Sequence, residues 1–183
     1  MTEKIRCAAI LAGGQSSRMK REKALIKVNG QPLIARTANI LRAIFPQIVV
    51  VTSKAEVAAA AGLEAITDQF PDCGPLGGIH AALRHFEQPI FVVACDMPFL
   101  SAAFIEEMNQ SFVGDAFVPQ HENGIEPLHA IYAPECLPVF EQLLTSGQRI
   151  PSFRKVLAEV DTHFISPPAG LSFENWNEPS DVR

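Results

Sequence analysis

Positively charged side chains follow a glycine turn near the N-terminus. An apolar run ends in Gly13 and Gly14, and Arg18 and Lys23 follow shortly after. Glycine permits close backbone approach, and the N–H groups of such a turn can bind an anion. Arg binds phosphate through a planar fork, and Lys binds it as a mobile point charge. These residues predict a polyphosphate site, and the alternative is a flexible turn whose charges are only solvated.

A second glycine loop lies in the middle of the chain. Asp68 follows a short apolar run, and the stretch GPLGG from Gly74 to Gly78 leads directly into a helical pattern. Unpaired N–H groups at a helix start suit an anion or the acceptor atoms of a base. The loop therefore predicts a nucleotide contact, and the alternative is an ordinary turn with a glycine N-cap.

An aspartate comes directly after a strong apolar run. Asp96 follows residues 90–95 and precedes Met97-Pro98. Mg²⁺ prefers one or two carboxylates together with phosphate oxygens and water. Asp96 is therefore the predicted metal ligand, and the alternative is that it caps the helix that begins near Ser101.

Other reactive side chains form no catalytic pattern. Neither a P-loop nor G-x-G-x-x-G can be written through the first glycine turn, which argues against a Rossmann-type oxidoreductase. The histidines are expected at the surface or as hydrogen-bonded core residues; they are His80, His85, His121, His129 and His163. The four cysteines are scattered without a CxxC pair, which is typical of reduced thiols in a cytoplasmic protein.

Composition limits the function classes. The chain has 183 residues, of which 48% are hydrophobic, and its net charge is −5. This length suits a single domain over residues 1–183, and the acidic balance argues against general nucleic-acid or membrane-surface binding. No secretory signal is recognisable and the apolar runs are too short to span a bilayer, so we expect a cytoplasmic protein.

Strand and helix patterns alternate along the chain. The expected strands are residues 6–11, 48–52, 63–67, 90–95, 116–119, 128–132 and 162–165, with helical patterns between most of them. This order predicts an α/β three-layer, Rossmann-like sandwich, with a mostly parallel sheet and helices on both faces. Ligands bind at the carboxyl ends of the strands in such sheets. The loops at that edge are 12–23, 52–54, 68–78 and 96–99, and 120–127 is a candidate fifth.

Taken together, the motifs resemble one family of nucleotidyltransferases. LAGGQSSRMKREK at residues 11–23, Asp68 before GPLGG, CDMP at 95–98 and the closing ENWNEPSDV are similar to the molybdenum cofactor guanylyltransferases of the MobA type. These enzymes are related to the nucleotide-sugar pyrophosphorylases. The resemblance spans the whole chain in the right order, which makes it more specific than any single motif.

The resemblance implies a reaction in which GTP and the phosphate of molybdenum-molybdopterin give the guanine dinucleotide cofactor and pyrophosphate, with Mg²⁺. Arg18 and Lys23 would hold the triphosphate, Asp96 would hold the metal, and Asn175 and Asn177 would lie towards the pterin. The implied nucleotide-binding residues are Leu11, Ala12, Gly13, Gly14, Lys23, Thr52, Asp68, Gly74, Pro75, Gly77 and Asp96. The implied protein partners are the molybdenum-insertion protein and molybdoenzyme chaperones, and the expected state is a monomer or small homo-oligomer.

Two positions depart from the family pattern. Lys20 stands where glycine is usual, and Thr52-Ser53-Lys54 stands where relatives often have an asparagine. The rival functions are transfer from CTP, transfer to another acceptor such as a sugar phosphate, and GTP-binding regulation without turnover. In each case we expect Lys23 and Asp96 to share one cleft, with both side chains exposed.

Overall fold

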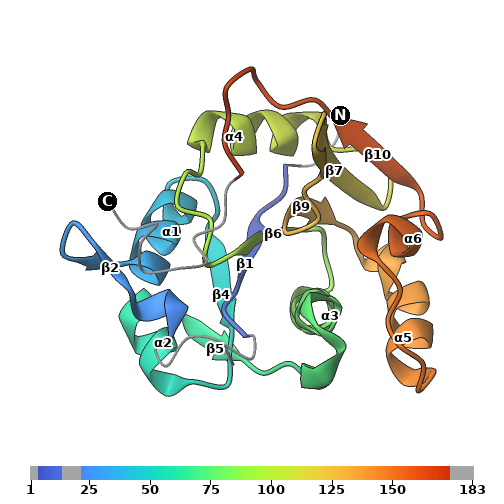
Figure 1. The fold of residues 1–183 in the computed structure, drawn as a ribbon, viewed down its shortest axis with the longest axis horizontal. Coiled ribbons are helices and arrows are strands. Elements are labelled where there is room, and N and C mark those ends of the chain that lie inside the picture. Colours follow the sequence, from blue (N-terminus) through green and yellow to red (C-terminus); the bar gives the residue numbers. More distant parts are fainter. Residues whose placement is uncertain (1–3, 14–21, 174–183) are drawn as a thin grey trace.

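A computed structural model describes residues 4–13 and 22–173 of the chain. Its main sheet has the strand order β10-β7-β9-β6-β1-β4-β5, with β8 paired to β7 (Figure 1). The strands are β1 (Cys7–Leu11), β2 (Lys27–Val28), β3 (Gln31–Pro32), β4 (Gln47–Val51), β5 (Glu64–Ile66), β6 (Ile90–Ala94), β7 (Ala116–His121), β8 (Gly124–Ile125), β9 (His129–Tyr132) and β10 (Thr162–Ile165). The helices are α1 (Leu33–Arg42), α2 (Ala55–Ala61), α3 (Pro75–Phe86), α4 (Ala102–Ser111), α5 (Leu137–Thr145) and α6 (Phe153–Leu157), with 3₁₀ turns η1 (Lys23–Leu25), η2 (Pro71–Cys73) and η3 (Pro134–Cys136).

Most of the sheet is parallel, as the sequence predicts. β1 pairs in parallel with both β4 and β6, and Leu11 lies opposite Val51 on one side and Ala94 on the other. β9 is antiparallel to both of its neighbours, β6 and β7. The three strands that end at Leu11, Val51 and Ala94 therefore present their carboxyl ends at one edge. The predicted α/β fold class and all seven predicted strands are confirmed.

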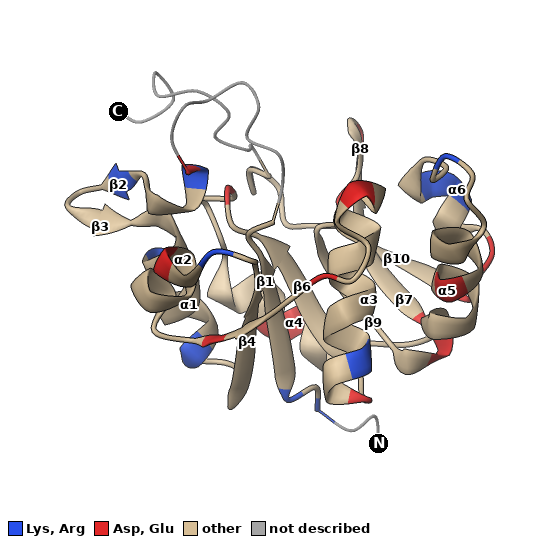
Figure 2. Ribbon diagram, turned by 90° about the horizontal axis from the view of Figure 1, so that it is seen from below, with Lys and Arg blue, Asp and Glu red and all other residues tan. Residues whose placement is uncertain are grey.

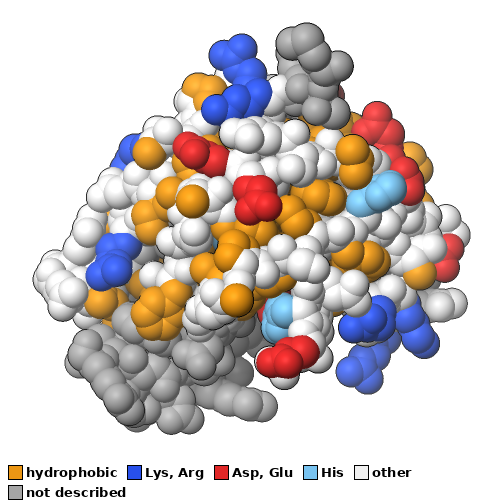
Figure 3. Space-filling view, turned by 90° about the horizontal axis from the view of Figure 1, so that it is seen from above, with side chains coloured by type: hydrophobic (Ala, Val, Ile, Leu, Met, Phe, Trp, Pro, Cys, Tyr) orange, Lys and Arg blue, Asp and Glu red, His pale blue; other side chains and the backbone are white. Residues whose placement is uncertain are grey.

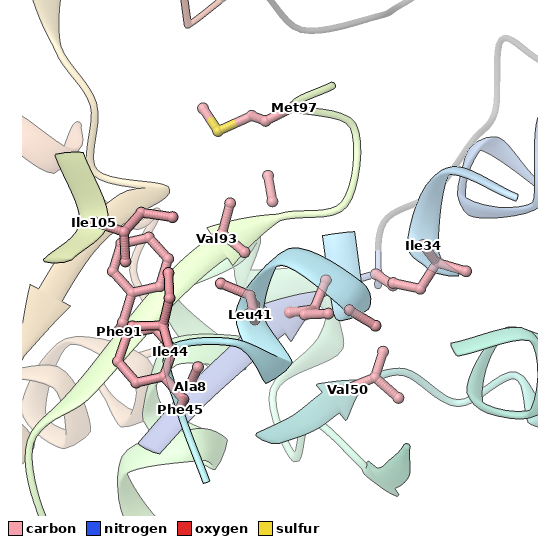
Figure 4. Packing of buried hydrophobic residues seen from close by; sticks show 14 of the residues in the cluster. Ala8, Ile34, Leu41, Ile44, Phe45, Val50, Phe91, Val93, Met97 and Ile105 are labelled. Carbon is pink, nitrogen blue, oxygen red and sulfur yellow. The ribbon is translucent and has the colours of Figure 1, made fainter. Parts of the chain in front are cut away.

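Helices cover both faces of the sheet because the residues of β1 alternate between two cores. Ala8 and Ile10 pack in a cluster with residues of α1, α2 and α4, whereas Cys7, Ala9 and Leu11 pack with residues of α3, α5 and α6. Both faces of a strand are buried in this way, which explains its continuous apolar sequence. Figure 4 shows the first cluster, where the Phe45 and Phe91 rings stack with centroids 5.5 Å apart.

The helix ends follow local sequence signals. Gly62 ends α2 in the left-handed conformation, and the Ser101 hydroxyl accepts a hydrogen bond from the N–H of Phe104 at the start of α4. Ser101, and not Asp96, therefore caps α4, which removes the alternative reading of that aspartate.

Among the residues that the structure describes, no helix has the length and apolar character needed to cross a bilayer. On the face over α4 and β10, hydrophobic side chains lie interspersed with charged ones (Figure 3). Two large exposed apolar residues in this part of the chain are Val113 and Phe164.

Candidate active site

Lys23 and Asp96 meet at the carboxyl edge of the sheet. The Lys23 Nζ lies 3.9 Å from Asp96 Oδ2. Asp96 follows β6, whose end is tied to β1 by a hydrogen bond from the N–H of Cys95 to the carbonyl of Leu11. Figure 2 shows basic and acidic residues close together on this side, near the β2–β3 hairpin. The sequence predicts that the loops after residues 6–11 and 90–95 meet at one edge of the sheet. The ion pair between Lys23 and Asp96 confirms this prediction.

A tight backbone turn holds Lys23 in place. The N–H of Leu25 donates to the carbonyl of Glu22 and the N–H of Ile26 donates to that of Lys23, each at 3.1 Å. Ala24, between them, is fully buried, and the N–H of Leu33 donates back to Ile26 at the start of α1. The small Ala24 side chain packs into the core, so the neighbouring Lys23 is directed towards the strand ends.

Asp96 is more deeply placed than the sequence indicates. The Lys23 and Asp96 side chains are only 25% and 21% exposed, so the expectation that both are exposed is wrong. Burial raises the pKa of Asp96, and the Lys23 ammonium and a backbone hydrogen bond lower it in part. The charged form of Asp96 is therefore less favourable here than in water. A cation or a cation-bound phosphate would stabilise that form.

Cys95 lies in the same charged environment and is unreactive. Burial raises the pKa of its thiol to about 12, and the negative charges of Asp96 and Glu22 add to the effect while Lys23 opposes it. Only a thiolate is a good nucleophile. Cys95 is therefore not a nucleophile of this site.

The second glycine loop brings Asp68 to the start of α3. Gly74 has a φ of +67° and precedes Pro75 at the first helical position. A Cβ on Gly77 would lie 2.5 Å from Asp68 Oδ1 and 2.7 Å from the carbonyl oxygen of Phe70. Glycine at 77 therefore leaves room for the Asp68 carboxylate against the helix N-terminus, whose dipole favours a negative charge.

Asp68 is held by its own loop. Its Oδ1 accepts a 2.6 Å hydrogen bond from the N–H of Phe70. Burial raises the pKa of Asp68, while that hydrogen bond and nearby His80 lower it. The Phe70 ring packs edge-on against His80, whose Nε2 lies 3.3 Å from Glu141 Oε1 on α5. The position of Asp68 thus depends on the packing of α3 against α5.

The ends of β1 and β4 supply backbone to the same edge. Leu11 and Ala12 are buried, and Gly13 is exposed immediately after them. Among the described residues, a Cβ on Gly13 would come nearest to the carbonyl oxygen of Val51, at 3.7 Å, and its φ is not in the left-handed range. The described part of the chain therefore leaves space for a side chain at this position. Thr52 is buried, and its hydroxyl accepts a hydrogen bond from the N–H of Lys54.

Some predicted site residues lie outside the described residues. These are Gly14, Arg18, Asn175 and Asn177, and the family departure at Lys20 lies there too. Of the remaining predicted residues, Lys23 and Asp96 form an ion pair, and the Asp68 carboxylate occupies the space that a side chain on Gly77 would need. Gly74 and Pro75 lie at the start of α3, while Leu11, Ala12, Gly13 and Thr52 lie at the strand ends beside them.

Two charged residues next to the site have no counterpart in the sequence-based prediction. Glu22 forms an ion pair with Lys54, and their side chains are 15% and 42% exposed. Lys54 is the N-cap residue of α2, directly beyond the end of β4. The two partners are 32 positions apart, so local sequence gives no signal of their contact.

His129 contradicts the expectation that every histidine is at the surface or hydrogen-bonded. It is 2% exposed on β9, and neither ring nitrogen has a hydrogen-bond partner among the residues that the structure describes. The rings of Phe91, Phe104 and Phe173 pack around it at centroid distances of 5.1, 5.9 and 5.2 Å. Burial lowers the pKa of His129 to about 3, so the ring is neutral at physiological pH. Next to it is a cavity of about 10 Å³, which is close to the size of one water.

The donor set favours a hard cation shared with phosphate. Among residues 4–13 and 22–173, no three His, Cys, Asp or Glu side chains gather as a metal cluster. Mg²⁺ is usually bound by one or two carboxylates with the remaining positions filled by phosphate oxygens and water. The single partly buried Asp96 carboxylate fits that mode.

Comparison with known proteins agrees with this geometry. The chain is 38% identical to the "Probable molybdenum cofactor guanylyltransferase" of Pelotomaculum thermopropionicum, over 94% of this chain and 88% of that protein. It is 32% identical to the "Molybdenum cofactor guanylyltransferase" of Syntrophotalea carbinolica, over 92% of this chain and 82% of that protein. The fold matches the crystal structure of molybdopterin-guanine dinucleotide biosynthesis protein A from Archaeoglobus fulgidus, with a TM-score of 0.79 and 27% identity over 96% and 94% of the two chains. Residues 8–163 match the MobA-like NTP transferase domain, and the chain therefore belongs to that family.

Proposed function

We propose that the protein transfers GMP from GTP to the phosphate of molybdenum-molybdopterin and releases pyrophosphate. The observation that carries the proposal is the 3.9 Å pairing of Lys23 with Asp96 at the edge where β1, β4 and β6 end. A cation and a carboxylate side by side suit a triphosphate and its metal ion. Full-length relatives named for this activity support the choice of substrates.

The nucleotide would lie along the carboxyl ends of the strands. Gly13 is exposed and the described part of the chain leaves space beside it, so we assign that space to the nucleotide. The N–H groups at the start of α3 would face the nucleotide, and Asp68 and Thr52 would contact the nucleoside. The full set proposed for the nucleotide is Leu11, Ala12, Gly13, Gly14, Lys23, Thr52, Asp68, Gly74, Pro75, Gly77 and Asp96.

Charge placement would do most of the catalytic work. Asp96 would hold Mg²⁺, which when bound supplies positive charge to the phosphate oxygens. Lys23 and Arg18 would neutralise the leaving pyrophosphate, and Asn175 and Asn177 would orient the acceptor. The attacking phosphate is already an anion, so no general base is needed. A reaction that needs no histidine base agrees with the buried, neutral state of His129.

Pyrophosphate release tests the proposal. Purified protein is incubated with Mg²⁺, molybdenum-loaded molybdopterin and GTP, CTP, ATP or UTP in turn. We expect release with GTP only when the acceptor is present, and loss of release on chelation of Mg²⁺. GTP should also raise the melting temperature most, because a ligand of the folded state stabilises it. Release with CTP would identify a cytidylyltransferase, and GTP binding without release would identify a regulatory protein.

Other features of the cellular role belong to the same proposal. A single nucleotidyltransferase domain over residues 1–183, acting in the cytoplasm as a monomer or small homo-oligomer, suits a chain with four free cysteines. The molybdenum-insertion protein and molybdoenzyme chaperones are the partners expected to deliver the pterin and receive the product. Size-exclusion chromatography with light scattering checks the oligomeric state.

A further inference from the structure

The ion pair between Glu22 and Lys54 joins two segments of the site that are distant in sequence. Glu22 immediately precedes the η1 turn, and Lys54 begins α2 beyond the end of β4. The Glu22 side chain is 15% exposed, so its charge is largely withdrawn from water, whereas Lys54 is 42% exposed. A buried carboxylate of this kind needs a partner, and Lys54 is the partner that the structure provides.

Hydrogen bonds hold the backbone of Lys54 in place. Its N–H donates a 3.1 Å hydrogen bond to the Thr52 hydroxyl, and the N–H of Thr52 donates to the carbonyl of Ile66 at the end of β5. The N–H of Val57 in α2 returns to the carbonyl of Lys54. The residue is therefore anchored to β4, β5 and α2 through its backbone, and only its side chain reaches across to Glu22.

Glu22 is coupled to Lys23 through the backbone. The Glu22 carbonyl accepts the first hydrogen bond of the η1 turn, and the next carbonyl, that of Lys23, accepts the second. Displacement of Glu22 would shift this turn and with it the start of the Lys23 side chain. Lys23 faces Asp96 at 3.9 Å, so a shift of about 1 Å in the turn is enough to misplace the ammonium group.

The two ion pairs also balance one another. Lys23 pairs with Asp96, and Lys54 pairs with Glu22, which leaves the four charges neutral as a set. The Glu22 charge is near enough to Cys95 to add to its raised thiol pKa, which agrees with a compact cluster.

We propose that Glu22 and Lys54 are positioning residues whose ion pair fixes the η1 turn and so holds Lys23 opposite Asp96. This inference rests on the proposed nucleotidyl transfer, in which Lys23 binds the triphosphate. It assigns Lys54 to the support of the site. The competing assignment, in which Lys54 itself binds phosphate, predicts a different pattern of variants.

A double-mutant cycle separates the two assignments. The variants are Glu22→Gln, Lys54→Met, the double substitution, and Lys54→Arg, which keeps the charge. Glu56→Gln and Lys27→Met are matched controls, because both residues are exposed and carry the same charges as the pair. Pyrophosphate release gives kcat and KM for GTP, calorimetry gives the GTP dissociation constant, and thermal unfolding gives the Tm.

If the pair positions Lys23, each single substitution lowers kcat/KM for GTP about five- to tenfold and the double substitution costs no more than the worse single one. Lys54→Arg then keeps most of the activity, and the controls stay at wild-type values. If the losses are additive, so that Lys54→Met costs the same with and without Glu22, the proposal is overturned and Lys54 is assigned to direct phosphate binding. Unchanged kcat/KM in both single variants would overturn it as well.

Failure of the proposed reaction would be recognised separately. If the wild-type protein releases no pyrophosphate from GTP and acceptor, the proposed function is wrong. GTP affinity measured by calorimetry then replaces turnover in the same cycle, with the same expected coupling. If GTP does not bind the wild-type protein either, Lys23 has no triphosphate to hold and the inference falls with it.

Discussion

Two titratable side chains at neighbouring strands lie in opposite electrostatic surroundings. Asp96 follows β6, and His129 begins β9, where it lies opposite Val93 of β6. Asp96 is partly exposed and faces the ammonium of Lys23. His129 is enclosed by aromatic rings and has no hydrogen-bond partner within the described part of the chain. Burial shifts the pKa of both groups towards the neutral form, upwards for the acid and downwards for the base.

The difference between them is a partner of opposite charge. Lys23 opposes the effect of burial at Asp96, whereas desolvation alone acts on His129. The parallel part of the sheet thus retains a charged pair at its open edge, and the antiparallel part has a neutral polar group inside its core. A charged group that is partly withdrawn from water is typical of a functional site. A neutral polar group inside the core is compatible with a purely structural role. Each of the following predictions tests one side of this contrast.

The largest effect is expected from removal of the charged pair. Lys23→Ala or Asp96→Ala should each cost at least about 2 kcal/mol of transition-state stabilisation, which is about thirtyfold in kcat/KM. The reason is that each removes a fixed charge at the place where phosphate charge must be neutralised. The measurement is steady-state pyrophosphate release with GTP.

Lys27→Ala is the matched control for Lys23, because Lys27 is an exposed lysine on β2 close in sequence. It should leave kcat/KM unchanged. Normal turnover by either Lys23→Ala or Asp96→Ala would show that the charged pair is not part of the catalytic site.

The second effect concerns stability in acid and depends on His129. Its pKa lies near 6.5 in the unfolded chain and at about 3 in the folded protein. Between these values the unfolded chain binds a proton that the folded protein excludes, so the free energy of unfolding falls as the pH is lowered. The contribution of one such group is about 1.4 kcal/mol per pH unit. His129→Phe should remove this contribution, which urea unfolding at pH 7, 6, 5 and 4 would measure.

The difference between the wild-type protein and the His129→Phe variant isolates the histidine, because the carboxyl groups titrate in both. The variant should lose less stability than the wild-type protein on going from pH 7 to pH 4. Parallel stability profiles would mean that His129 is able to bind a proton in the folded state and that its environment is not as dry as the ring contacts indicate.

Local patterns predict much of this molecule, and contacts across the chain account for what they miss. The apolar run that begins at Ile90 predicts β6 to within one residue, because a strand pattern depends only on neighbouring residues. The meeting of Lys23 with Asp96 follows from the rule for strand ends. The short β2–β3 hairpin and β8 carry too few residues for a recognisable pattern.

Burial and partner choice are less accessible from sequence. The neutrality of His129 depends on rings from β6, α4 and the segment after β10, which no local pattern connects. The pairing of Glu22 with Lys54 likewise requires the fold to bring η1 beside the end of β4. The extent to which Asp96 is covered is a property of the assembled edge, and the residues next to it in sequence do not indicate it.

A third prediction tests the second glycine loop at the charged edge. Gly77→Ala would place a Cβ 2.5–2.7 Å from the Asp68 carboxylate and the Phe70 carbonyl oxygen. The loop must shift, at a cost of about 1–3 kcal/mol in stability. We expect weaker GTP binding by calorimetry and a lower Tm. Gly147→Ala is the control: a Cβ there meets none of the described residues within 4 Å, but its φ of +69° strains an alanine, so this variant should lower the Tm without weakening GTP binding.

The smallest predicted effect is a gain in stability from a substitution of Asp96 that also abolishes activity. Because burial raises the pKa of Asp96, the folded protein favours its protonated form, and the free energy of unfolding rises as the pH falls through that raised pKa. Asp96→Asn imitates the protonated form at every pH. It should abolish turnover while raising the Tm by about 2–4 °C, the shift produced by about 1 kcal/mol in a protein of this size. A lower Tm would mean that the attraction of Lys23 outweighs the cost of burying the carboxylate, and Asp96 would then be a structural ion-pair partner. A higher Tm with lost turnover would show that the Asp96 charge lowers the stability of the folded protein. This is expected of a residue whose charge serves ligand binding.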